Sequence, residues 1–161
     1  MSGMSRIVKT VASFTFPFVL IYGIYIIAHG HLTPGGGFQG GAIVASGCAM
    51  ILIAYGSIWT IEKVKEKKLS LLESLGAIGF IVLAFLGIFM VVDNNAFFKN
   101  FLANSNTIFG GPVVFGETAA NINSAGILPF MNFAVGLKVI AGLFAIVLIM
   151  AYATTCKEEK K

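Results

Sequence analysis

Charged residues are scarce in this sequence of 161 residues, where Asp, Glu, Lys and Arg together make up only 11%. The hydrophobic fraction is 57% and the mean hydropathy is +0.90, values that exclude an ordinary soluble domain and indicate a polytopic membrane protein. The formal net charge of +4 does not indicate nucleic-acid binding, because the cations lie in separate clusters beside apolar runs. We therefore expect a lipid bilayer, and no nucleic acid, around the chain.

Cysteine and histidine are nearly absent, with two of each. Cys48 falls within a predicted membrane span and Cys156 beyond the last one, so a disulfide would have to join residues at unlike depths. Neither thiol belongs to a C-x-x-C motif, and two histidines without further ligands do not make a metal site. The sequence therefore predicts no disulfide, no metal and no cofactor, and we do not expect the chain by itself to be an enzyme.

Long apolar runs are what the sequence does contain. Four of them are each long enough to cross a bilayer, so we predict an all-α integral membrane protein with one domain over residues 1–161. The first run is too long for the core of a signal peptide, and we expect a kink rather than a break at Pro17. The predicted spans are residues 7–28, 38–61, 72–92 and 125–151.

The connections between these spans differ in character. Residues 62–71 carry six charged side chains and are predicted to be a solvated helical turn or loop, whereas residues 94–124 are rich in phenylalanine and should lie against protein. Nine of the eleven cations fall on the side of the two termini, and Lys99 alone falls on the other. This asymmetry predicts a multi-pass plasma-membrane protein with both termini and the charged loop in the cytoplasm and the long apolar loop outside.

Residues 29–42, between the first two spans, hold both histidines and six of the chain's 19 glycines, five of them within residues 35–41. The spacing of Gly37, Gly41, Ala45 and Ala49 gives the second span a flat face on which another helix can pack closely. A phosphate-binding loop is excluded, because no G-x-x-x-x-G-K-[ST] motif, preceding strand or cation is present. Helix packing is the predicted role, with direct ion or water contact as the alternative. The predicted packing motif consists of Pro34, Gly35, Gly36, Gly37, Phe38, Gln39, Gly40, Gly41 and Ala45.

One cation lies inside a predicted span. Lys138 is about 12 residues, or roughly 18 Å, from either end of residues 125–151, too far for its side chain to reach an interface. A cation at the bilayer centre costs on the order of 3 kcal/mol. We expect no acid of the same chain at this depth, so the partner should be a carboxylate elsewhere or a water-filled cavity. Participation in an ion path and a structural ion pair both stay open. Small residues surround Lys138 at helical spacing and favour a close-packed neighbour over lipid: Ala134, Ala141, Gly142 and Ala145.

Four further ionisable residues are candidates for an ion path. Glu73 and Asp93 lie at opposite ends of the third predicted span, where an ordinary boundary charge is the alternative explanation. His29 and His31 flank Gly30 at the outer end of the first span, and histidine can change protonation near neutral pH. Proton handling is therefore a candidate role for this pair.

Two segments resemble a known family. Thr33-Pro-Gly-Gly-Gly-Phe-Gln-Gly-Gly-Ala42, followed by an apolar span, resembles the signature of the MnhB/MrpB family, small membrane subunits of the multisubunit sodium/proton antiporter. Residues 123–139, which end in Val-Gly-Leu-Lys-Val, are similar to a turn and helix of that family. Relatives also occur in the membrane arms of archaeal energy-converting hydrogenases and sulfur-reducing complexes. The resemblance implies sodium/proton exchange as a property of the whole assembly.

We therefore predict a non-catalytic membrane subunit of a cation/proton antiporter assembly, whose partners are other membrane subunits and whose transported ions are sodium and protons. The alternative is a scaffold subunit in the membrane arm of a redox-driven ion pump. A self-sufficient homodimeric transporter would need a central acid that both copies share, and the first two spans contain none.

Overall fold

The computed structural model describes residues 4–32, 35–89, 97–98 and 126–158, and these residues contain helices but no strand. Four of the helices are long and apolar enough to cross a membrane. The prediction of an all-α protein with four spans is therefore confirmed. The helices are α1 (Arg6–His29), α2 (Gly36–Tyr55), α3 (Ser57–Lys63), α4 (Glu66–Phe89) and α6 (Leu128–Glu158).

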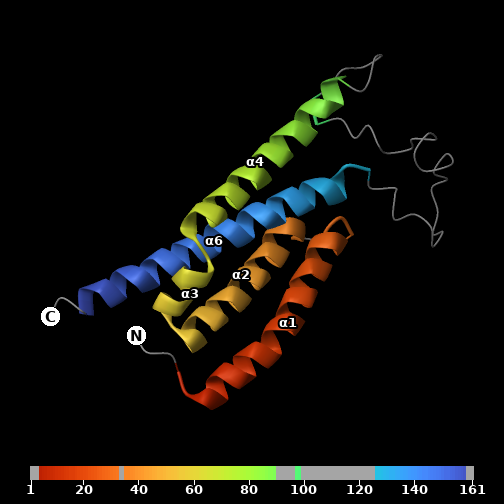
Figure 1. Cartoon of the computed structure of the whole chain (residues 1–161). Coiled ribbons are helices and arrows are strands. Elements are labelled where there is room, and N and C mark those ends of the chain that lie inside the picture. The colour runs from red at the N-terminus through yellow and green to blue at the C-terminus, as the bar shows by residue number, and fades with distance from the viewer. Residues whose placement is uncertain (1–3, 33–34, 90–96, 99–125, 159–161) are drawn as a thin grey trace.

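The first span, α1, runs through Pro17 without a break. Figure 1 shows that this helix bends along its length. A proline inside a helix removes one backbone hydrogen bond and crowds the preceding turn, which is the physical reason for a bend. The kink predicted from the sequence is therefore present.

For the second span, predicted as residues 38–61, the predicted end is wrong. Gly56 has φ 93° and ψ 158°, a conformation that no helix contains, and its N–H closes α2 on the carbonyl of Leu52 at 2.9 Å. The carbonyl of Gly56 then accepts hydrogen bonds from both the N–H and the hydroxyl of Thr60, which start α3. Residues 57–61 therefore belong to a separate short helix.

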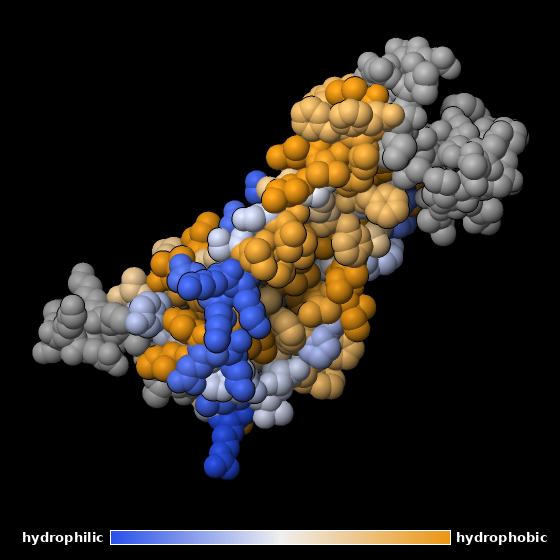
Figure 2. All heavy atoms as spheres, turned by 45° about the horizontal axis from the view of Figure 1, so that its top comes forward, coloured by the Kyte–Doolittle hydropathy of each residue, from blue (hydrophilic) through white to orange (hydrophobic). Residues whose placement is uncertain are grey.

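The charged segment 62–71 is mostly helical. Only Val64 and Lys65 connect α3 to α4, and α4 begins at Glu66, six residues before the predicted start of the third span. The segment is solvated as expected, because most of its charged side chains are exposed. Figure 2 shows hydrophilic residues gathered in one band, while hydrophobic residues dominate the rest of that face.

The helices pack in the order α1, α2, α6, α4, with α2 and α6 in the middle (Figure 1). Many large apolar side chains of the outer helices are exposed, including Phe14 at 71% and Phe89 at 80%. Such surfaces are stable when lipid or another apolar surface covers them. The N–H of Met4 donates to the carbonyl of Ala54 at 3.0 Å, so Met4, the first described residue, lies at the end of the bundle where α2 leads into α3.

Candidate functional site

Two glycines with positive φ form the turn from α1 into α2. Gly35 has φ 111° and Gly36 has φ 35°, values that side chains disfavour. A Cβ placed on Gly36 would lie 2.9 Å from Oδ1 of Asn132 on α6, so the space beside this turn is filled as well. Glycine is therefore required at Gly36 by both conformation and contact. Pro34 of the predicted motif lies outside the described residues.

Glycines on two faces of α2 bring its backbone against both neighbouring helices. A Cβ on Gly40 would lie 2.7 Å from the carbonyl oxygen of Gly23 on α1. On the other face, a Cβ on Gly41 would lie 2.9 Å from the carbonyl oxygen of Gly136 on α6. Gly37 faces the backbone of Asn132 on that same side. Spacing from the sequence indicated the face toward α6 but missed the face toward α1.

The other members of the predicted packing motif have different surroundings. Ala45 is buried at 5% exposure, whereas Phe38 is 61% exposed. Gln39 is exposed, and its side chain folds back over Gly35. Phe38 therefore offers its ring to lipid or to another protein rather than to this bundle.

Asn132 is a site residue that sequence reasoning missed. It is half-buried on α6, and its side chain or backbone fills the space beside Gly30, Gly36 and Gly37. A polar side chain in an apolar span is expected to find a polar partner, and Asn132 is the only amide among residues 125–151. Its position as the only amide in this apolar segment was the sequence feature that could have identified it.

The two histidines lie together beside this glycine turn. His29 ends α1 and stacks on Tyr25, with ring centroids 5.3 Å apart. The ring of His31 lies 6.3 Å from that of His29, and its Nδ1 is 3.2 Å from the carbonyl oxygen of Ala28. Within the described part of the chain, no group of three or more His, Cys, Asp or Glu side chains could hold a metal ion.

Lys138 lies where α6 crosses close to α4. A Cβ on Gly76 would lie 2.8 Å from the backbone N of Lys138 and 2.9 Å from its Cβ, so the two backbones are in close contact. The lysine side chain itself is exposed. The neighbour expected from the sequence therefore contacts the base of Lys138, while the lysine side chain stays exposed.

Glu73 lies on the same line of contact. It is half-buried on α4, and a Cβ on Gly142 would lie 3.4 Å from its Oε1. Gly142 follows Lys138 by one helical turn, about 6 Å along α6. We name Glu73, Gly76, Lys138 and Gly142 the α4–α6 seam.

The sequence led us to expect no acid of this chain at the depth of Lys138. That expectation treated Glu73 as a boundary charge at the start of the third predicted span, residue 72. Because α4 begins at Glu66, Glu73 lies about two turns inside the helix. Its position brings it within about one turn of Lys138 along the seam.

Asp93 and most of the apolar segment 94–124 lie outside the described residues. Phe97 and Phe98 are described, and both lie against α4. The N–H of Phe98 donates to the carbonyl of Ala84 at 3.2 Å, and the ring of Phe97 meets that of Phe85 at a centroid distance of 5.2 Å. These two residues pack as the sequence led us to expect.

The fold and site together define a small four-span membrane protein with glycine-mediated helix packing and a lysine and a glutamate between two spans. Residues 7–145 match the family described as a domain related to the MnhB subunit of Na+/H+ antiporter. The chain belongs to this MnhB family, and the resemblance noted in its sequence is confirmed.

Similar proteins occur in archaea and in bacteria. An uncharacterized protein of Methanocaldococcus jannaschii is 43% identical over 125 residues, which are 75% of this chain and 42% of that protein. A Na+/H+ antiporter subunit from Bacillus subtilis is 30% identical over 86 residues, which are 53% of this chain and 52% of that protein. The chain thus spans about half the length of the curated relatives it matches.

A solved structure shares the fold. A chain of the membrane-bound sulfane sulfur reductase, an archaeal respiratory membrane complex, superposes with a TM-score of 0.72 at 30% identity. The match covers 91% of this chain and 58% of that one. The same helical arrangement therefore occurs in a subunit of a larger membrane complex.

Proposed function

We propose that this chain is a non-catalytic membrane subunit of a multisubunit sodium/proton antiporter assembly, and that Lys138 and Glu73 contribute to its ion path. The observation that carries the proposal is the exposed Lys138 beside Glu73 on the α4–α6 seam. Membership of the MnhB family supports the antiporter assignment. Sodium ions and protons would be moved by the assembly, with no exchange by this chain alone.

An exposed lysine at this place needs a covering group. Lys138 lies ten residues after Leu128, the start of α6, or about 15 Å along the helix. An uncompensated cation at the bilayer centre costs on the order of 3 kcal/mol. A carboxylate of another subunit, or water held between subunits, would offset that cost. A cavity of about 320 Å³, lined in part by Gly76, Phe80 and Lys138, leaves room for such a group.

The seam can act on ions through its charges. A carboxylate is a hard oxygen ligand suited to cations such as sodium, and it also takes up protons. The ammonium of Lys138 within reach of a carboxylate biases that group toward its ionised form and opposes a second cation nearby. Lys138 therefore modulates the occupancy of an acid supplied by a neighbouring subunit, with Glu73 as the acid of this chain on the same path.

The remaining candidates have supporting roles in this proposal. His29 and His31 adjoin the glycine turn and would exchange protons with water at that end of the bundle. Asp93 remains a candidate for the ion path on the basis of the sequence alone. The glycine motif serves helix packing, because its contacts are with helix backbones of α1 and α6.

A redox-driven pump is the second candidate function. The structural match to a chain of the sulfane sulfur reductase complex favours it. In that case the chain would be a scaffold subunit in a membrane arm, and electron transfer elsewhere would drive ion movement. The α4–α6 seam would contact partner helices in either assembly.

The proposed location is the plasma membrane, with both termini in the cytoplasm. The cations of α1 and α3 and those that begin α4 lie at the end of the bundle where the described chain starts. An excess of lysine and arginine on one side is typical of cytoplasmic loops.

Affinity purification through a tag on this chain tests the proposal. The expected result is co-purification of several membrane subunits, together with sodium-dependent proton movement in inverted vesicles that is lost when the chain is deleted. Proton movement that requires an electron donor would favour the redox-driven pump. Purification of the chain alone, with exchange unaffected by its deletion, would contradict both candidates.

A further inference from the structure

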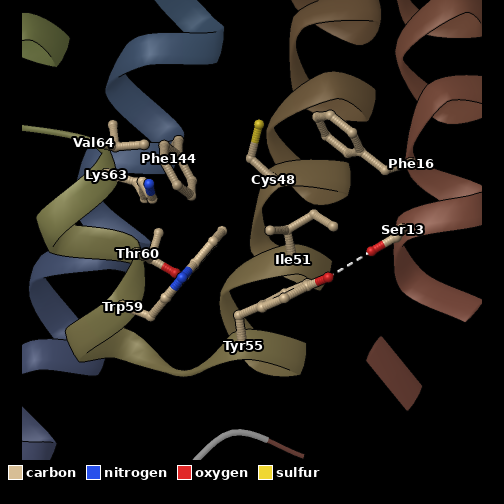
Figure 3. A pocket seen from close by; sticks show the side chains of 10 residues that line it. All are labelled: Ser13, Phe16, Cys48, Ile51, Tyr55, Trp59, Thr60, Lys63, Val64 and Phe144. Atoms are coloured by element: carbon tan, nitrogen blue, oxygen red, sulfur yellow. Dashed lines mark hydrogen bonds between the residues drawn. The ribbon is translucent and has the colours of Figure 1, made fainter. Parts of the chain in front are cut away.

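A cavity of about 360 Å³ lies among α1, α2, α3 and α6, at the end of the bundle that carries α3. Figure 3 shows side chains from all four helices around it. Its volume falls within the range of about 300–1,000 Å³ that small-molecule sites occupy. The cavity reaches the surface beside Ser13, Trp59 and Lys63, which are exposed.

The walls of this cavity are mostly apolar. Phe16 of α1, Ile51 of α2 and Phe144 of α6 line it, and Phe144 is buried at 5% exposure. Near the mouth of the cavity, the hydroxyls of Ser13 and Tyr55 are 2.7 Å apart and form a hydrogen bond with each other (Figure 3). An occupant of the inner part must therefore be hydrocarbon.

Aromatic and cationic groups frame the mouth. The rings of Tyr55 and Trp59 stack with centroids 4.5 Å apart, and Nζ of Lys9 lies 5.7 Å from the centroid of the Tyr55 ring. Lys63 lines the cavity, and none of the described residues that line it is acidic. Tyrosine and tryptophan favour the membrane–water interface, and lysines there attract anionic head groups.

We propose that this cavity binds an anionic membrane phospholipid, with one hydrocarbon chain between Phe16, Ile51 and Phe144 and the phosphate near Lys9 and Lys63. The apolar wall excludes a polar metabolite, and cations at the mouth complement a phosphate. Tyr55 and Trp59 lie at the level where the head group of the lipid meets its hydrocarbon chain. The lipid would join α1 to α3 across the end of α2, a role independent of ion movement.

Photolabelling of the assembled complex tests this site. Two probes with a diazirine in the acyl chain are used at low mole fraction in phosphatidylcholine vesicles, one phosphatidylglycerol and one phosphatidylcholine. Phosphatidylglycerol should label the peptides that contain Phe16 and Ile51 in preference to phosphatidylcholine. Lys63→Gln should lower that preference about fivefold, the order expected for one lysine near an anionic surface. Lys67→Gln, which removes an exposed lysine that does not line the cavity, should leave it unchanged.

A second variant tests the contribution of the cavity separately from that of the lysine charges. Ile51→Trp places a larger ring in the cavity while Lys9 and Lys63 remain, so selective labelling should disappear. Equal labelling by the two probes would overturn the proposal, because it would show unselective contact with surrounding lipid. Labelling absent from Phe16 and Ile51, with a benzophenone at position 51 crosslinking to another subunit, would also overturn it and assign the cavity to a protein helix.

Discussion

Enlarging Gly41 perturbs the contact between α2 and α6 at its closest point. A Cβ there would lie 2.9 Å from both the carbonyl oxygen of Gly136 and the Cβ of Val139, whereas ordinary contact begins at 3.4 Å. The helices must therefore separate by about 0.5 Å to admit one methyl group. The carbonyl oxygen is backbone and cannot rotate away as a flexible side chain could.

The energetic effect of this change can be bounded. Overpacking of a tight interior costs about 1–3 kcal/mol, and close packing is the main force that joins helices in lipid. A loss of about 2 kcal/mol lowers the ratio of packed to unpacked protein roughly 30-fold. We expect Gly41→Ala to weaken incorporation into the assembly and Gly41→Leu to abolish it.

Co-purification of the complex through a tagged partner subunit measures this effect. Ser46→Leu is the matched control, because Ser46 is exposed on the same helix and has room for a leucine. Incorporation of Gly41→Leu at the wild-type level, with normal exchange, would refute the reasoning, since it would mean that α2 and α6 do not need close contact.

Three further predictions concern other parts of the chain. In a background without Cys48 and Cys156, single cysteines at Ser70 and Asn106 should be labelled from opposite sides of the membrane, and labelling from one side would contradict the four-span topology. Asn132→Leu keeps the branched shape of the side chain but replaces the amide beside Gly30 and Gly36 with two methyl groups, so the complex should lose about 1–2 kcal/mol of stability in a thermal co-purification assay. An unchanged midpoint would show that Asn132 only fills space. Tyr55→Phe removes the 2.7 Å hydrogen bond to Ser13 and should cost about 1 kcal/mol in the same assay, while Tyr22→Phe, at an exposed position of α1, serves as its comparison.

The sequence predicted the helical class and the number of spans because the length of each apolar run follows directly from its consecutive residues. It also predicted that Pro17 would bend α1 without ending it. The end of α2 could not be predicted, because a glycine is compatible with many backbone conformations and the positive φ of Gly56 is fixed by its neighbours. The start of α4 was misplaced since charged residues can continue a helix beyond the apolar run.

Candidate site residues were identified singly from the sequence, but their spatial relations were not. Lys138 was conspicuous as a cation in an apolar span, yet its proximity to Glu73 depends on how α4 and α6 align. Likewise, the small residues at Gly37 and Gly41 indicated a flat helix face, whereas the contact between Gly40 and Gly23 depends on the path of α1. Contacts between distant segments require the tertiary arrangement.

The central claim is that the charge of Lys138 acts in the ion path of an assembly. Lys138→Met keeps much of the side-chain volume and deletes the charge, and Lys67→Met deletes a charge at an exposed position outside the α4–α6 seam. Sodium-dependent proton exchange, followed with a pH-sensitive dye in inverted vesicles, is the direct measurement, with assembly checked by pull-down. We predict that the Lys138→Met complex assembles but exchanges at least tenfold more slowly, or with a displaced pH profile. A tenfold lower rate corresponds to a rise of about 1.4 kcal/mol in the activation free energy. Lys138→Arg should recover part of the rate, and Lys67→Met should behave as wild type. An assembled Lys138→Met complex with an unaltered rate and pH profile would contradict the account and leave Lys138 as a structural cation.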